Sequence, residues 1–134
     1  MKAMIYLDAN IFVYAVLDDG KKGEFCKKLL EKVAFKQINA FTSVLTWDEV
    51  IYSLKKHVPI DELMRQSKEF FKFPNLVFLD ANFKILKKAE EILFKYNLGP
   101  RDAIHVATAL NNGVLQIASD DSDFNKVKEI KRIF

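Results

Sequence analysis

Acidic residues directly follow several of the short apolar runs in this sequence. Asp8 ends the run Met4–Leu7, and the stretch "SDDSDF" follows the run Leu115–Ala118. Carboxylates brought together repel one another unless a cation neutralises them, and several of them without histidine or cysteine form the ligand set that Mg²⁺ or Mn²⁺ prefers. Zinc is disfavoured. Other acids that follow apolar runs or open helical segments are Glu49, Asp80 and Asp102.

The tetrapeptide "LDAN" occurs twice, at residues 7–10 and 79–82. In each copy the Asp or the Asn is a residue type that caps the helix that follows, by accepting hydrogen bonds from its free N–H groups. Spacing alone does not decide whether both copies belong to an active site or whether one of them is only a helix cap.

Each of the other acids also has a structural explanation. Glu49 has capping-box spacing from Thr46, Asp102 falls in a first helical turn where the dipole favours negative charge, and "SDDSDF" suits a turn before a capped helix. At any one position we favour the structural explanation. The set is harder to dismiss, because Asp8 and "SDDSDF" follow strands that are neighbours if the first strand is central. His57 and His105 are expected to be surface or packing residues rather than ligands.

The elements that would position these acids alternate along the chain. Short β-rich runs are separated by longer segments of helical period, including one over Val44–His57 and another from Pro59 to about Phe71, while Gly99-Pro100 separates two more. The expected strands are Met4–Leu7, Ile38–Thr42, Leu76–Leu79, Leu115–Ala118 and Ile130–Phe134. Such alternation predicts a parallel α/β sheet covered by helices on both faces, with ligands bound where the strands end.

Composition sets the wider limits. With 134 residues, half of them hydrophobic and 29% charged, we expect one globular domain over residues 1–134. The longest apolar run, Ile11–Leu17, is too short to span a membrane, and no signal peptide is visible, so we expect a cytoplasmic protein. Cys26 is the single cysteine, which excludes an internal disulfide. The net charge of +3 permits a polyanionic partner without requiring one.

Four blocks of sequence carry a family resemblance. In chain order they are "YLDANIFVYA", "TSVLTWDEV", "GPRDAIHVATAL" and "IASDDSDF". Together they resemble the PIN-domain ribonucleases, particularly the VapC-like toxins of bacterial and archaeal toxin–antitoxin pairs, from Asp8 to Phe124 and the closing strand. The resemblance implies a three-layer α/β/α PIN-like domain whose parallel five-stranded sheet has the order 3-2-1-4-5. It also implies a divalent-metal-dependent endoribonuclease that uses Mg²⁺ or Mn²⁺.

The same resemblance assigns site residues. The metal-binding acids map to Asp8, Glu49, Asp102 and Asp121, with Asp123 as a supporting or additional ligand. Asn10 and Ser43 match polar positions that orient water, phosphate or the acids. At Ala9 the family often has threonine or serine, so we expect weaker support of the metal rather than inactivity.

The implied strand order also answers the question of the two LDAN copies. The third strand would be an edge strand, which separates Asp80 from Asp8 by roughly 10 Å, too far for the two to share a metal. The first copy then belongs to the active site, and the second is a helix cap.

The implied partners are an RNA substrate, a cognate VapB-like antitoxin and a second copy of the chain in a homodimer. Candidate phosphate contacts are Lys21, Lys22, Arg101 and Lys126, and the apolar seam of a dimer could come from segments 20–35 and 44–71.

Alternatives to a toxin are a PIN-domain nuclease in RNA processing and a non-catalytic RNA- or protein-binding PIN domain. A receiver-type phosphoacceptor at Asp80 is disfavoured, because the chain lacks the acidic pair and the lysine after the last strand that such domains require.

Overall fold

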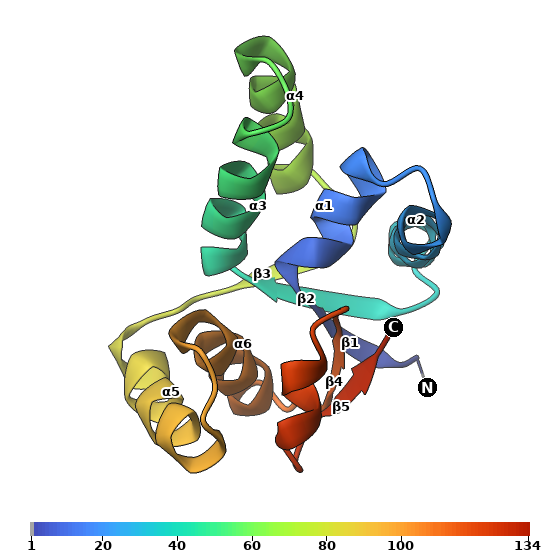
Figure 1. The fold of residues 1–134 in the computed structure, drawn as a ribbon. Coiled ribbons are helices and arrows are strands. Elements are labelled where there is room, and N and C mark those ends of the chain that lie inside the picture. The colour runs from blue at the N-terminus through green and yellow to red at the C-terminus, as the bar shows by residue number, and fades with distance from the viewer. Residues whose placement is uncertain (1) are drawn as a thin grey trace.

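The computed structural model describes residues 2–134 and is organised around one parallel sheet (Figure 1). The sheet has five strands in the order β3-β2-β1-β4-β5, which confirms the predicted topology. All neighbouring strands pair in parallel. The strands are β1 (Met4–Leu7), β2 (Asn39–Ser43), β3 (Leu76–Leu79), β4 (Gln116–Ala118) and β5 (Lys131–Ile133).

Helices cover both faces of this sheet, as the alternating pattern predicted (Figure 1). On one face lie α1 (Ala9–Leu17), α2 (Lys21–Ala34), α3 (Leu45–Lys55) and α4 (Ile60–Phe71). On the other lie α5 (Phe83–Tyr96) and α6 (Pro100–Asn111), and a short 3₁₀ helix, η1 (Ser122–Lys126), connects β4 to β5. Pro59 directly precedes α4 and Pro100 is the first residue of α6, because proline fits the start of a helix and not its interior.

Two hydrophobic clusters hold the layers together. Leu7, Ile11 and Leu54 belong to the cluster between the sheet and α1–α4, whereas Tyr6 and Phe124 belong to the cluster on the α5–α6 side. Tyr6 and Leu7 are adjacent on β1 and point to opposite faces, as the two-residue period of a strand requires. Both are fully buried, so the central strand is covered on both sides.

The register of the sheet determines where the first acid emerges. Leu7 on β1 pairs with Ala118 on β4, and the backbone N–H of Asp8 donates to the carbonyl of Ala118 at 3.1 Å. The residues that follow these two strands, Asp8 and Ser119, therefore leave the sheet next to each other.

The second LDAN copy lies elsewhere, at the edge of the sheet. It follows β3, which β2 separates from β1, and Asp80 is exposed there. The side chain of Asn82 caps α5 by accepting a hydrogen bond from the N–H of Ile85 at 3.1 Å. This copy is a helix cap, and Asp80 does not have the central position that a phosphoacceptor would need.

None of the helices within residues 2–134 combines the length and apolar character required to cross a bilayer.

Candidate metal centre

Acids from separate parts of the chain line one pocket of about 290 Å³. Asp8 follows β1, Glu49 lies on α3, Asp102 opens α6, and Asp121 precedes η1. The rest of the lining is Ala9, Asn10, Val13, Tyr14 and Ser53. The structure thus brings together the acids that the resemblance assigned to a metal.

Asp8 is held at the start of α1 by several donors. Its Oδ1 accepts from the backbone N–H of Ala9 at 2.7 Å, so the residue also caps the helix. Its Oδ2 accepts from the hydroxyl of Ser119 at 2.6 Å and from the amide of Asn10 at 3.3 Å. Despite these donors, burial raises the pKa of the Asp8 carboxyl, with the charge of Glu49 adding to the effect and the charge of His105 opposing it.

Glu49 lies inside α3 and makes no capping box. The helix begins at Leu45 after Val44, which provides no side-chain cap, and the hydroxyl of Thr46 is bonded to that of Thr42 instead. The Glu49 carboxylate contacts the ring of His105, with Oε1 2.5 Å from Nε2. This pair joins α3 to α6, and Glu49 lines the pocket from α3.

His105 is a site residue whose polar role was not predicted from the sequence. The side chain is fully buried, and Nε2 also lies 3.5 Å from Oδ1 of Asp8. Burial disfavours a charged ring, but the hydrogen bond to Glu49 and the charges of Asp8 and Glu49 together raise the pKa of His105 above its usual value. Its spacing was the available signal, because the residue three positions after Asp102 lies on the same helix face. His57, by contrast, is exposed after α3.

Asp102, Asp121 and Asp123 form a second group, in which ligand oxygens lie within 4.8 Å of one another. Burial raises the pKa of the Asp102 carboxyl to about 7, and hydrogen bonding with Asp121 and the charges of Asp121 and Asp8 add to the effect. Asp121 caps η1 by accepting from the backbone N–H of Asp123 at 2.9 Å. Asp123 itself is exposed and lies 3.6 Å from the ammonium of Lys126.

Asn10 and Ser119 connect these two groups. The amide of Asn10 donates to the hydroxyl of Ser119 at 3.1 Å and accepts from the backbone N–H of Asp120 at 3.4 Å. The hydroxyl of Ser119 also accepts from the backbone N–H of Asp121 at 3.0 Å. Asn10 thus lies where it can orient Asp8. Ser119 was not foreseen, although its position directly after β4 was a usable signal.

Ser43 and Ala9 lie at the margins of this arrangement. Ser43 is buried at the end of β2, where its hydroxyl accepts from the backbone N–H of Leu45 at 3.0 Å. It does not line the acidic pocket, and its assignment to the site stays a prediction. Ala9 does line the pocket but offers no oxygen from its side chain.

The donor set suits a hard divalent cation. The pocket presents carboxylate oxygens from Asp8, Glu49, Asp102 and Asp121, the ligand type that Mg²⁺ and Mn²⁺ prefer. Burial raises the pKa of both the Asp8 and the Asp102 carboxyl, so a nearby cation would stabilise their charged forms. A divalent ion would supply the missing positive charge.

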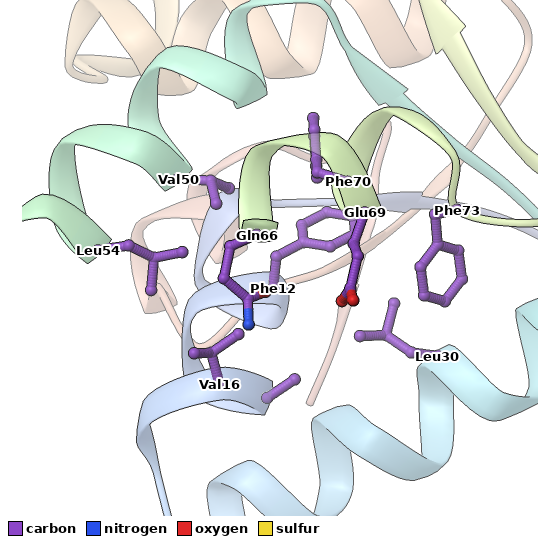
Figure 2. Close-up of a pocket in the computed structure, with 10 residues that line it drawn as sticks. Phe12, Val16, Leu30, Val50, Leu54, Gln66, Glu69, Phe70 and Phe73 are labelled. Atoms are coloured by element: carbon purple, nitrogen blue, oxygen red, sulfur yellow. The ribbon is translucent and has the colours of Figure 1, made fainter. Parts of the chain in front are cut away.

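A second pocket, of about 110 Å³, lies on the other side of α1 and is mainly apolar (Figure 2). Phe12 and Val16 line it from α1, Leu54 lines it from α3, and the polar ends of Gln66 and Glu69 from α4 border it. The remaining lining residues are Ala15, Leu30, Val50, Phe70 and Phe73. Helix α1 therefore separates an acidic pocket from an apolar one.

Residues 5–130 match a protein family described as PIN domain. The chain is 33% identical over 135 residues to Ribonuclease VapC2 of Methanocaldococcus jannaschii, covering 92% of this chain and 88% of that protein. It resembles a toxin–antitoxin complex from Klebsiella pneumoniae with a TM-score of 0.70, 20% identity and coverage of 97% and 96% of the two chains. It also resembles Mycobacterium tuberculosis VapC20, described as a sarcin-ricin loop cleaving toxin, with a TM-score of 0.75, 14% identity and coverage of 90% and 92%.

At these identities the two solved structures bear on the fold only. The family match and the sequence relative go further, because both extend over nearly the whole chain. The chain belongs to the PIN domain family.

Proposed function

We propose that this chain is a divalent-metal-dependent endoribonuclease and acts as the toxin of a toxin–antitoxin pair. One observation carries the proposal: carboxylates from four separate parts of the chain line a single pocket. A relative that covers most of the chain is named a ribonuclease, which supports RNA as the substrate. We also infer that residues 1–134 form one PIN domain that works in the cytoplasm, where RNA and an antitoxin would be available.

Asp8, Glu49, Asp102 and Asp121 would hold Mg²⁺ or Mn²⁺. The bound ion would supply a Lewis acid that polarises a phosphodiester oxygen and acidifies an attacking water. The protein would supply orientation: Ser119 and Asn10 fix the Asp8 carboxylate through hydrogen bonds at 2.6 and 3.3 Å. Rigidly held ligands matter because small misplacements of reacting groups are costly to the rate.

Basic residues near the pocket are candidates for contacts with flanking phosphates. Lys22 lies 2.8 Å from Asp120, which also accepts from the hydroxyl of the pocket residue Tyr14 at 2.9 Å. Arg101 precedes Asp102 in the first turn of α6 and is exposed, and Lys126 is close to Asp123. We expect these cations to add to RNA affinity in a salt-dependent way and to leave the chemical step to the acids.

The decisive experiment is cleavage of structured RNA by the purified chain with Mn²⁺ or Mg²⁺. We expect cleavage to stop with EDTA and to fall by roughly 10³-fold in Asp102→Asn, since a metal site contributes several kcal/mol to the barrier. Cleavage that survives both changes would contradict the metal mechanism. Metal binding without cleavage of any RNA in a broad panel would favour a non-catalytic RNA- or protein-binding PIN domain.

An antitoxin partner is the second part of the proposal. The pockets on the two sides of α1 suit one inhibitory segment, whose apolar residues would enter the pocket beside Val16 and whose arginine or lysine would meet the acids. If the reading frame immediately upstream encodes a short protein, co-expression should yield a complex that does not cleave RNA. Val16→Glu should prevent that complex and leave cleavage intact. An active nuclease that forms no such complex would favour a role in RNA processing.

A homodimer is the third part. Large apolar side chains are exposed on α3 and α4, including Trp47, Ile60, Met64 and Phe71. The ring of Trp47 stacks on that of Phe71 at 6.1 Å between centroids, which makes this patch continuous across both helices. Sedimentation equilibrium should give a mass close to twice that of the chain. A Trp47→Glu variant should be monomeric, and a wild-type chain that is already monomeric would contradict the dimer.

A further inference from the structure

The imidazole of His105 lies behind the acids and outside the pocket that they line. The side chain is fully buried on α6, and the pocket lining includes Asp8, Glu49 and Asp102 but not His105. Its Nε2 lies 2.5 Å from Oε1 of Glu49 and 3.5 Å from Oδ1 of Asp8. The ring therefore contacts the candidate ligands from the protein side, where it can orient them without replacing them.

The opposite edge of the ring is fixed by Tyr6. The phenol oxygen of Tyr6 lies 2.6 Å from Nδ1 of His105, and the two rings meet edge to face with centroids 5.5 Å apart. In a neutral ring the Tyr6 hydroxyl donates to Nδ1, and in a charged ring Nδ1–H donates to the phenol oxygen. In both states Nε2 carries the hydrogen that is donated to Glu49.

This donor matters because Glu49 has little else to hold it. Among residues 2–134, the ring of His105 is the one hydrogen-bond partner that the Glu49 carboxylate has. Asp8, in contrast, is also held by Ala9, Ser119 and Asn10. A glutamate side chain has three rotatable bonds, and ordering it costs conformational entropy unless a fixed partner selects one conformation.

We propose that His105 is a positioning residue that fixes the Glu49 carboxylate for the divalent ion, and that Tyr6 fixes the imidazole in turn. The inference rests on the proposed function, because it concerns how the acids of that site hold their metal. Partners behind metal ligands typically change metal affinity by about 10- to 100-fold when removed. His105 should therefore act on metal affinity through Glu49 rather than on the fold alone.

The experiment compares two substitutions of similar size. The amide nitrogen of Gln can reach the position of Nε2 and donate to Glu49, whereas that of Asn reaches only the position of Nδ1. Mn²⁺ affinity is measured from the loss of the EPR signal of free Mn²⁺, with thermal unfolding of the metal-free variants alongside. We expect His105→Asn to weaken Mn²⁺ binding by about 10- to 100-fold and His105→Gln to restore most of it. Tyr6→Phe should weaken binding less than His105→Asn does.

A double-mutant cycle with Glu49 separates positioning from a purely structural role. In a Glu49→Ala background, His105→Asn should cause no further loss of Mn²⁺ affinity, because the carboxylate that it positions is gone. An equal loss in both backgrounds would overturn the proposal, as would unchanged affinity in a folded His105→Asn. If His105→Asn does not fold, Tyr6→Phe takes its place in the cycle, and its failure to weaken binding would overturn the proposal in the same way.

The wild-type chain separates this inference from the function on which it rests. A folded wild-type chain that binds no Mn²⁺ and cleaves no RNA would contradict the proposed function itself. Binding and cleavage by the wild type, together with unchanged Mn²⁺ affinity in the His105 and Tyr6 variants, would overturn the positioning role and leave the nuclease proposal standing.

Discussion

The two halves of the candidate metal centre differ in how the protein balances their negative charge. The inner half, formed by Asp8, Glu49 and His105, is buried or partly buried, and hydrogen-bond donors from the protein meet its carboxylates. The outer half, formed by Asp102, Asp121 and Asp123, is more exposed and contains only acids. Here the burial of Asp102 raises the pKa of its carboxyl, and the charge of Asp121 adds to the effect.

The difference separates two roles that acids can have in one site. Carboxylates of the inner half belong to the hydrogen-bonding of the fold, since Asp8 caps α1 and is bonded to Ser119 beside β4. Those of the outer half are held near one another by helix starts and a turn, at an electrostatic cost. A divalent cation would remove that cost, so we expect the outer half to dominate the coupling between metal binding and stability.

Replacing one acid in each half should give the largest contrast. Asp8→Ala and Asp102→Ala should both reduce RNA cleavage by roughly 10³-fold. Their effects on the metal-free protein should have opposite signs. Asp8→Ala should lower the free energy of unfolding by about 2 to 4 kcal/mol, because it removes a helix cap and leaves buried donors unpaired. Asp102→Ala should raise the free energy of unfolding by about 1 kcal/mol. The substitution removes a carboxylate that neighbouring acids repel and introduces alanine, which favours a helix.

Urea unfolding in EDTA, monitored by circular dichroism, measures these stability changes. Conservation of the m-value would show that each variant changes stability rather than the unfolded state. Destabilisation of similar size by both substitutions would remove the distinction between the halves.

The stabilisation caused by added Mn²⁺ provides a second test of the difference between the two halves. At a Mn²⁺ concentration of 100 times its dissociation constant, the wild-type chain should gain about 2.7 kcal/mol in the free energy of unfolding. Asp102→Ala should lose most of this gain at the same Mn²⁺ concentration, because its outer half no longer needs the cation. A Mn²⁺-free buffer brought to the same ionic strength with NaCl serves as the control for simple screening. A gain of equal size in Asp102→Ala would place the coupling in the inner half.

Much of the fold was readable from the sequence. Alternation of apolar runs and helical periods predicted the elements, because a central parallel strand is covered on both faces and leaves a continuous apolar run, as in Met4–Leu7. Pro59 and Pro100 marked helix starts through their fixed backbone geometry. The order of the strands came from the family resemblance, since local patterns carry no information on which strands are neighbours.

The site was less accessible for a physical reason. Acids after strands could be recognised one at a time, but the pairing of Glu49 with His105 joins residues 56 positions apart and depends on how α3 and α6 pack. Ser119 gave no signal as a residue type, because a serine after a strand is common in turns. Thr46 and Glu49 had the spacing of a capping box. In the structure Thr46 is hydrogen-bonded to Thr42 and Glu49 to His105, so neither side chain caps the helix. Local patterns thus found the candidate ligands and the family resemblance added Asn10, but neither identified His105 or Ser119, which also contact those ligands.

The free energy of unfolding of the metal-free protein should also depend on pH, through the charge of Asp102, with a smaller effect than that of the substitutions. Asp102 has a pKa of about 7 in the folded chain against an ordinary value of 3.8, so its protonation stabilises the fold. That contribution is fully present below about pH 4 and is lost as the pH rises through about 7. The raised pKa values of Asp8 and His105 act in the same direction. We expect unfolding free energy to fall by about 1 to 2 kcal/mol from about pH 5.5 to about pH 8, after allowance for solvent screening at Asp102.

Denaturant unfolding in EDTA at both pH values measures this change, and Asp102→Ala is the matched variant. It should retain only the part that comes from Asp8 and His105. Stability that rises over this interval in the wild type would contradict the assigned directions.

The smallest effect should come from the most exposed acid of the outer half. The Asp123 carboxylate is half exposed and lies 3.6 Å from the ammonium of Lys126, so solvent and a cation already balance it. Asp123→Asn should change cleavage by no more than about threefold, in keeping with the energy of surface ion pairs. It also retains the backbone N–H that donates to Asp121 at 2.9 Å. Asp121→Asn is the control, since the same substitution two positions earlier removes a pocket carboxylate and should nearly abolish cleavage. Equal losses in the two variants would make Asp123 a full metal ligand and would contradict the minor role expected for it.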